Sequence, residues 1–151
     1  MTAAPLPAQA ELQPRRIPAT AADVHALLAD LALHFDLRGI AGPRSIDLHL
    51  LLAEVMNNIV EHALAGRADG WIELRVDRAP DGLRVALGDN GAPLPEALLR
   101  PAPPPDATAG EGCPEGGFGW AMIHALSSGL SYRRQDGINR LDLRFPYDRA
   151  G

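Results

Sequence analysis

The sequence contains no lysine, so all 14 of its Lys-plus-Arg residues are arginines. This absence excludes a phosphate-loop lysine, a Schiff-base lysine and a Ser-Lys catalytic pair. Cys113 is the single cysteine, which excludes an internal disulfide and gives no information about a zinc site. We interpret it as a free thiol in a loop. No two of the five histidines lie at a ligand spacing such as i, i+4, which disfavours zinc chemistry.

Other features are also missing from the chain. No apolar run approaches the roughly 20 residues of a membrane span. Residues 1–10 are rich in alanine and proline and have no basic residue before an apolar core, so they are not a secretory signal. We expect a disordered tail there and a cytoplasmic protein without membrane contact. The net charge of −5 argues against direct nucleic-acid binding. The length of 151 residues suits one domain with one core.

What is present begins with a predicted helix over residues 47–62, with Ser45 as its cap and Gly66 as its stop. At 100° per residue, this helix has an apolar stripe beside a narrow polar one. An ordinary amphipathic helix explains this pattern, and so does a site for a metal ion and a proton. The apolar stripe contains Leu48, Leu52, Val55, Ile59 and Ala63, and the polar stripe contains Asp47, Glu54, Asn58, Glu61 and His62.

The rest of the chain predicts a covered sheet. Residues 11–19 suit an edge strand because of their prolines. Thr20 and Asp23 suit a capping box for a core-facing helix that continues to about Phe35. Two hairpins are expected, one from residues 70–77 and 83–87 and one from 130–134 and 138–145. Each strand alternates apolar and polar residues, which is typical of an antiparallel sheet covered on one face.

Strand parity gives Asp89 a special position. Leu83, Val85 and Leu87 point to the core, so Asp89 continues on the core side at the end of the strand. A buried carboxylate is costly unless it is hydrogen-bonded. It is therefore either a turn aspartate bonded to its own backbone, before Asn90 and Gly91, or an acceptor for an N–H group of a ligand.

A long proline-rich segment over about residues 92–116 resists regular structure, apart from a short helical turn at residues 96–100. Loops longer than about 12–15 residues in a small domain are usually lids, binding loops or disordered. Gly117 and Gly119 then open an apolar helix that contains Trp120 and Ile123. Glycines at a helix start let backbone N–H groups approach an anion, and a flexible loop end explains them equally.

These three signals occur in a fixed order: Glu54-x-x-x-Asn58-x-x-x-His62, Asp89-x-Gly91-x-Pro93 and Gly117-x-Gly119. This order resembles the Bergerat-type ATP-binding domain of gyrase, histidine kinases and MutL. Within that superfamily, the chain is most similar to the anti-sigma-factor serine kinases of bacterial partner-switching modules. The resemblance covers residues 11–147. It implies a two-layer α/β (α+β) sandwich with a mixed, largely antiparallel sheet and helices on one face.

The resemblance also implies a role for each residue. Asn58 would ligate Mg²⁺ that bridges the phosphates of ATP, and Glu54 would be the general base for transfer of the γ-phosphoryl group. Asp89 would accept a hydrogen bond from the adenine amino group, and Gly91 would leave room for the base. The backbone at Gly117 and Gly119 would line the phosphates, and His62 would lie near the phosphate end. The implied partners are an antagonist protein that carries the target serine and a sigma factor, with the kinase acting as a homodimer.

The chain departs from the family at two positions. Phe118 stands where related kinases often carry a basic residue, and the lid from residue 101 to 115 has none, so Arg100 is the nearest candidate. Trp120 replaces the leucine that is usual in the family. Two alternatives remain beside the kinase: a non-catalytic ATP-dependent interaction module and a detached histidine-kinase ATPase domain. A histidine-kinase phosphoacceptor helix before residue 20 is not expected, which argues against the last one.

Overall fold

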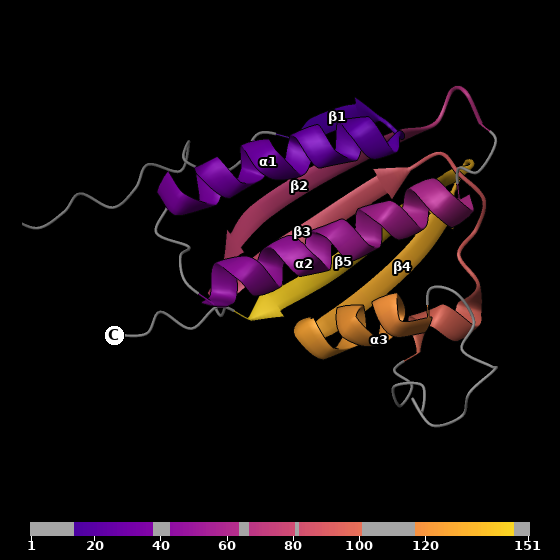
Figure 1. Cartoon of the computed structure of the whole chain (residues 1–151). Helices are drawn as coiled ribbons and strands as arrows, with labels where there is room; N and C mark the ends of the chain where they lie inside the picture. Colours follow the sequence, from indigo (N-terminus) through magenta and orange to yellow (C-terminus); the bar gives the residue numbers. More distant parts are fainter. Residues whose placement is uncertain (1–13, 38–42, 64–66, 81, 101–116, 147–151) are drawn as a thin grey trace, which may run out of the picture.

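The protein forms two layers, with three α-helices packed on one face of a five-stranded sheet (Figure 1). The computed structural model describes residues 14–37, 43–63, 67–80, 82–100 and 117–146. The predicted tail, Cys113 and most of the predicted lid lie outside these residues. The two-layer α/β fold is confirmed, and each pairing between described strands is antiparallel.

The sheet has the strand order β1-β2-β3-β5-β4. β1 lies at the edge, as its prolines predict, and pairs with β2 alone. The two predicted hairpins are β2 with β3 and β4 with β5, and their strands are longer than predicted. The strands are β1 (Arg15–Pro18), β2 (Trp71–Ala79), β3 (Gly82–Asp89), β4 (Gly129–Gln135) and β5 (Ile138–Pro146).

The turn of the second hairpin contains two residues rather than three. Gln135 pairs with Ile138, so it belongs to the strand. Asp136 and Gly137 make the turn with φ values of 55° and 77°. Positive φ at both central positions is typical of a type I′ turn, which matches the twist of the flanking strands.

The helices are α1 (Ala21–Leu37), α2 (Pro43–Asn58) and α3 (Gly117–Leu126), and a short 3-10 turn, η3 (Glu96–Leu99), lies where a helical turn is predicted. Thr20 caps α1 as expected: its hydroxyl oxygen accepts from Asp23 N–H at 3.0 Å and donates to the Asp23 carboxylate at 2.6 Å. The predicted cap at Ser45 is wrong, because α2 begins two residues earlier at Pro43. Proline suits a first helical position, where its missing N–H costs nothing.

The long central helix does not stay α-helical to His62. Residues Ile59–Ala63 form a π-helical turn, η2. A π turn bonds i to i+5, and such turns are often found at functional sites. The predicted helix thus continues past Asn58 as a π turn, which carries Glu61 and His62.

One hydrophobic core fills the space between the layers. The apolar stripe of α2 is buried as predicted, and Leu51 and Met56 widen it. The inward residues of all the long strands meet this stripe, which confirms the predicted parity. The hydrophobic residues exposed by 1% or less are Val24, Leu31, Leu48, Leu51, Leu52, Val55, Met56, Ile72, Val85, Ile123, Leu143 and Phe145.

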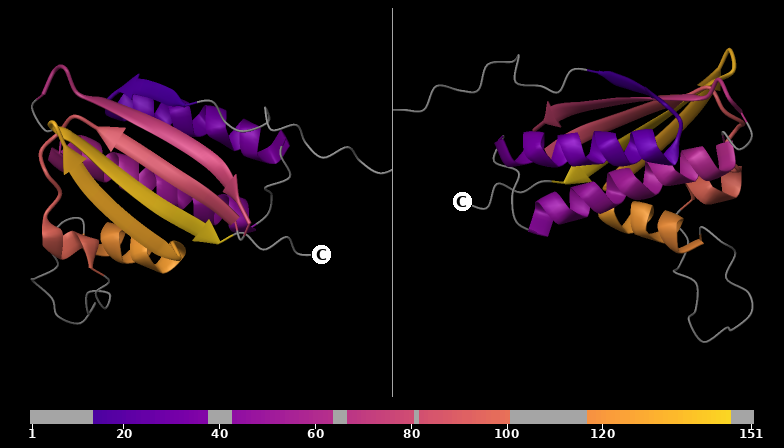
Figure 2. Two further views of the ribbon diagram at one scale, coloured as in Figure 1. Left: turned by 180° about the vertical axis from the view of Figure 1, so that it is seen from behind. Right: turned by 45° about the horizontal axis from the view of Figure 1, so that its top comes forward.

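The opposite face of the sheet carries no helix, as the view from behind shows for the described residues (Figure 2). The ends of α2 and β3 and the first turn of α3 lie at one end of the two layers (Figure 1). None of the described helices is long and apolar enough to span a membrane.

Candidate functional site

Glu54 and Asn58 face Gly119 across the contact between α2 and α3. They are one turn apart on α2, so their side chains lie on the same face. A Cβ atom added to Gly119 would lie 2.6 Å from Glu54 Oε2 and 3.3 Å from Asn58 Nδ2. The structure therefore brings together three predicted site residues from two separate segments, and it explains why a glycine is required here.

Neither polar side chain is satisfied within the described part of the chain. Asn58 is 6% exposed, and its Nδ2 is buried without an acceptor. Half-buried Glu54 makes no hydrogen bond or ion pair with the described residues. A buried polar group without a partner is rare, because burial removes its hydrogen bonds to water and no hydrogen bond within the protein replaces them. An amide and a carboxylate left open at one place indicate a ligand.

Asp89 lies at the end of β3 and is 3% exposed, which confirms its predicted inward position. Its Oδ1 accepts from Gly91 N–H at 2.8 Å and from Asn139 Nδ2 at 2.9 Å. Both interpretations of this residue are thus compatible: Oδ1 closes a turn onto its own backbone, while Oδ2 accepts no hydrogen bond from the described residues. Oδ2 is available to an N–H group of a ligand.

Burial raises the pKa of Asp89 above its ordinary value. The Asn139 side chain, the Gly91 N–H and the charge of Arg134 act in the opposite direction, and none of them is as large as the burial effect. Burial has this effect because loss of hydration penalises the charged form of the carboxyl group.

Asn139 is a site residue that the sequence reasoning missed. It is 1% exposed, and its Nδ2 also donates to the carbonyl oxygens of Gly91 at 3.3 Å and Ala92 at 2.8 Å. Its Oδ1 accepts from the Tyr132 hydroxyl at 2.6 Å and from Arg134 at 2.8 Å. The sequence pattern could have placed it, because residues 139, 141, 143 and 145 share one face of the strand. Asn139 therefore has the same inward parity as Leu141.

The same network fixes the first residues of the predicted lid. Arg134 donates to the Gly91 carbonyl at 2.8 Å, and Leu94 N–H donates to the Tyr132 hydroxyl at 3.1 Å. Gly91 is buried, its N–H donates to Asp89 Oδ1, and its carbonyl oxygen accepts from Arg134. The Asp89 end of the site is therefore built by β3, β4 and β5 together.

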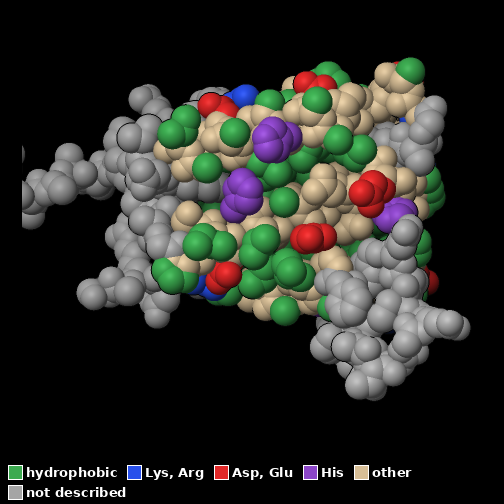
Figure 3. All heavy atoms as spheres, in the orientation of Figure 1, with side chains coloured by type: hydrophobic (Ala, Val, Ile, Leu, Met, Phe, Trp, Pro, Cys, Tyr) green, Lys and Arg blue, Asp and Glu red, His purple; other side chains and the backbone are tan. Residues whose placement is uncertain are grey.

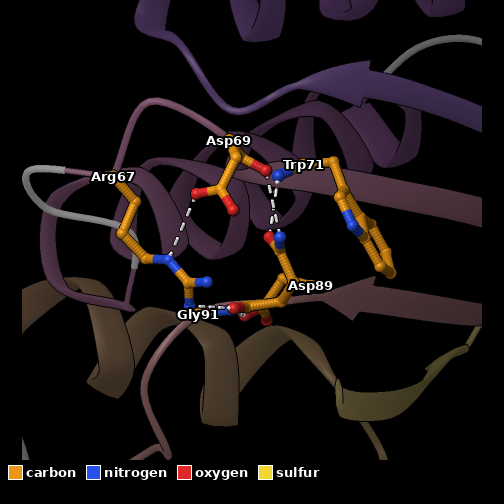
Figure 4. A network of polar contacts seen from close by, with 6 residues as sticks. Arg67, Asp69, Trp71, Asp89 and Gly91 are labelled. Atoms are coloured by element: carbon orange, nitrogen blue, oxygen red, sulfur yellow. Dashed lines mark hydrogen bonds and ion pairs between the residues drawn. The ribbon is translucent and has the colours of Figure 1, made fainter. Parts of the chain in front are cut away.

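A second set of contacts holds the residue that follows Asp89 (Figure 4). Trp71 N–H donates to Asn90 Oδ1 at 2.9 Å, and Asn90 Nδ2 donates to the Asp69 carbonyl at 3.0 Å. Arg67 donates to the Asn90 carbonyl and lies 3.5 Å from the Asp69 carboxylate. The chain between α2 and β2 is thus tied to the residue that follows Asp89.

The remaining predicted residues are Gly117, His62 and Arg100. Gly117 is the first residue of α3, as expected for a phosphate-facing turn. His62 is half exposed, and its Nε2 lies 4.0 Å from the Glu61 carboxylate. Arg100 is exposed and lies 3.7 Å from Glu96 on its own helical turn. Nothing in the described part of the chain joins these last two residues to Glu54.

Trp120 lies in the core at 5% exposure, with its ring centroid 6.0 Å from that of His124. His124 Nε2 in turn lies 2.8 Å from the Leu98 carbonyl, which ties α3 to η3. The indole N–H is buried without a partner among the described residues. The larger side chain thus fills space at the start of α3, and nothing in the structure explains its unbonded N–H.

Comparison with known proteins identifies the family of this chain. A family model described as a histidine kinase-like ATPase domain matches residues 17–145. The chain belongs to this family. The predicted relationship to Bergerat-type ATPases is thereby confirmed, and the matched residues include Glu54, Asn58, Asp89 and Gly119.

One curated relative is similar in sequence. It is the serine/threonine-protein kinase BtrW of Bordetella bronchiseptica, 33% identical over 97 residues. The match covers 64% of this chain and 66% of that kinase, a little under two thirds of its length.

Two solved structures share the fold at low identity. The SiaB–SiaC complex from Pseudomonas aeruginosa gives a TM-score of 0.60 at 18% identity and covers 92% of both chains. The RsbU and RsbW domains of a Mycobacterium tuberculosis protein give 0.56 at 20% identity, with 91% of this chain and 34% of that chain covered. These matches agree with the two-layer architecture.

Proposed function

We propose that this chain is an ATP-binding serine/threonine protein kinase that regulates a bacterial partner-switching system by phosphorylating an antagonist protein. The observation that carries the proposal is the approach of Glu54 and Asn58 to Gly119, with Asp89 buried at the same end of the fold. Sequence similarity to a serine/threonine-protein kinase supports it.

The residues present fit Mg²⁺ and ATP. The unengaged Oδ2 of Asp89 suits the adenine amino group, which donates hydrogen bonds. Asn58 has a buried amide without a partner among the described residues, so its oxygen can ligate Mg²⁺ or its N–H can donate to a phosphate oxygen. The missing side chain of Gly119 leaves space beside both groups. When bound, Mg²⁺ neutralises charge on the phosphate oxygens.

Glu54 acts as the general base in this proposal. Its carboxylate takes the proton of a partner serine as the serine oxygen forms a bond to the γ-phosphorus. The bond from that phosphorus to the bridging oxygen breaks, and its electron pair leaves with ADP. Because Glu54 has no partner among the described residues, no existing hydrogen bond must be broken first.

The first turn of α3 is proposed to hold the phosphates. The first four N–H groups of a helix have no partner within it, and the helix dipole adds roughly half a positive charge at this end. Gly117 and Gly119 place these donors within reach of an anion. In a chain without lysine, backbone donors supply what a phosphate-binding lysine supplies elsewhere.

An ATP-dependent interaction module without phosphotransfer is the second candidate. The observation that favours it is Arg100, the predicted lid cation, which is exposed and lies beside Glu96. By family resemblance, the proposed partners are an antagonist protein and a sigma factor, the proposed assembly is a homodimer, and the proposed location is the cytoplasm. The structural similarity to SiaB in its complex with SiaC supports a protein partner.

The test is to incubate the protein with Mg·ATP and the product of the neighbouring gene, then measure intact masses. One added phosphate on the partner supports the kinase, and complex formation without added mass supports the interaction module. Glu54→Ala should remove the modification while calorimetry shows ATP binding largely intact. Glu61→Ala, which changes a 69% exposed side chain nearby, is the matched control and should keep full activity.

A further inference from the structure

The uncovered face of the sheet has an unusual composition. Side chains on this face come from the outward parity of every strand (Figure 2). Six are arginines and three are carboxylates, although the whole chain has a net charge of −5. We call this surface the arginine face. It contains Arg16, Arg75, Arg84, Arg133, Arg140 and Arg144, with Glu73, Asp77 and Asp142 among them.

The two faces of the molecule differ in charge. The helical face shows carboxylates and histidines, and Arg side chains reach it only near its edges (Figure 3). The sheet thus separates a face rich in arginine from a face that holds the nucleotide site and much of the negative charge.

The strand register places like charges directly opposite each other. Arg84 on β3 lies across from Arg144 on β5, and Arg140 on β5 lies across from Arg133 on β4. All four are exposed, and none forms an ion pair with another described residue. Like charges in directly opposed positions destabilise a sheet. Arg84 also has Asp77 of β2 directly opposite on its other side, whereas Arg140 has Gly88 there, so the pair of Arg140 and Arg133 is the less compensated one. A carboxylate placed between these arginines would relieve the remaining repulsion.

The centre of this face carries small residues. Gly88 and Ala86 lie in neighbouring rows of β3 and present almost no side chain between the arginines. At one edge, the Arg16 guanidinium stacks on the half-buried ring of Trp71, 3.8 Å from its centroid, and also bonds Glu73. Arginine and tryptophan are enriched in protein–protein interfaces, and lysine is depleted there.

We propose that the arginine face binds the acidic surface of a protein partner. Arginine suits this role because its planar guanidinium binds carboxylates with two parallel hydrogen bonds. Nucleic acid and anionic membranes fit less well, because both present a uniform negative surface. Such a surface would meet Glu73, Asp77 and Asp142 within the same face, whereas a protein can place its own cations opposite them.

This surface lies across the sheet from Glu54 and Asn58, which belong to the helical layer. A protein bound to the arginine face would therefore leave the nucleotide site accessible. The proposal does not rest on kinase activity, because an inactive ATP-binding module would carry the same face.

The test measures fluorescence anisotropy of three labelled probes at low ionic strength: poly-L-glutamate, duplex DNA of equal charge and phosphatidylserine vesicles. We expect wild-type protein to bind poly-L-glutamate in preference to the other two. The triple variant Arg84→Gln, Arg140→Gln, Arg144→Gln should bind it about tenfold more weakly, as expected when three exposed charge pairs are lost.

The matched control is Arg15→Gln, Arg78→Gln, Arg100→Gln, which changes the net charge equally through exposed arginines away from this face. It should retain most of the binding. Loss of binding that is equal in both triple variants, tighter binding to DNA or vesicles, or no binding of poly-L-glutamate would each overturn the proposal.

A stability measurement separates binding from a structural role. Removal of the two repulsive pairs should leave the Tm of the Arg84, Arg140, Arg144 variant unchanged or raise it by about 1–3 °C. ATP affinity should not change. A lowered Tm would mean that these arginines serve the fold, and it would contradict the proposal.

Discussion

Substitution of Gly119 by alanine tests the geometry of the site directly. The added Cβ would lie 2.6 Å from Glu54 Oε2, whereas ordinary contacts begin at 3.4 Å, so the carboxylate must retreat by about 0.8 Å. Asn58 Nδ2 lies 3.3 Å from the added Cβ, so it needs to move by only about 0.1 Å. The substitution therefore acts chiefly on the proposed general base.

Stability should hardly change. The atom that must move is the far end of a flexible side chain, and it breaks no hydrogen bond with the described residues. Alanine is also favoured over glycine within a helix by about 1 kcal/mol, which offsets the local crowding. We expect the free energy of unfolding in urea to stay within about 1 kcal/mol of the wild type.

Phosphotransfer should fall much more. A misplacement of about 1 Å in a reacting group can cost roughly 10²-fold in rate, so we expect kcat to drop by about that factor. The assay is the rate of partner phosphorylation at saturating Mg·ATP, followed by intact mass. Gly129→Ala is the control, because its Cβ would meet only Arg144 Cδ at 3.8 Å.

A second variant separates this cause from general damage. Glu54→Asp shortens the side chain by one methylene, so its carboxylate would not meet the new methyl group. Gly119→Ala should therefore reduce the rate by a smaller factor in the Glu54→Asp background than in the wild type. Additive losses, or a wild-type rate in the single Gly119→Ala variant, would refute the assignment of Glu54 to this position.

Three further predictions concern the Asp89 end of the site. Asp89→Asn should abolish ATP binding in calorimetry, because an amide N–H replaces the acceptor Oδ2, and unchanged affinity would exclude the adenine assignment. Because the pKa of Asp89 is raised on folding, the native state binds an extra proton between the unfolded and folded pKa values, and wild-type stability falls as pH rises through that window. The Asn variant should thus be equally or more stable in urea at pH 7, with the difference vanishing below the window; a less stable variant at pH 7 would contradict this. Asn139→Leu should lower the free energy of unfolding by about 2–4 kcal/mol, because it leaves several buried polar groups unpaired, and a loss below about 0.5 kcal/mol would contradict its role.

Local patterns were sufficient wherever the answer depended on one strand or one helix. The alternation of Leu83, Val85 and Leu87 placed Asp89 inside, because side chains on a strand change face at every residue. The stripe on α2 likewise gave its buried face. These predictions needed no knowledge of distant contacts.

Asn139 shows what such patterns could not provide. Its inward parity was readable, but its partner Asp89 is 50 residues away and on a different hairpin. The pairing follows from the register of β3 with β5, which sets Asp89 opposite Asn139. Neighbouring residues do not encode that register, so the asparagine could be placed inside but not assigned a partner.

The π turn at the end of α2 was missed for a different reason. Residues Ile59–Ala63 show a period that an α-helix accommodates equally well from sequence. A π turn adds one residue to a helical turn, and long-range packing decides whether it forms. This turn carries His62, whose half-exposed side chain lies beside the Glu61 carboxylate.

The lack of lysine also bears on how the site would handle phosphate charge. Asp89 and Glu54 both add negative charge near a nucleotide, and Arg100, the cation predicted nearest to the lid, lies on the exposed surface beside Glu96. In the proposed function, the favourable field would come from the first turn of α3 and from Mg²⁺ held at Asn58. Backbone donors keep their positions when neighbouring side chains change, whereas a lysine would bring a mobile charge and a long side chain into a space where even one methyl group at Gly119 would displace the Glu54 carboxylate. The close packing of α3 on Glu54 and the use of backbone donors are therefore two consequences of one arrangement.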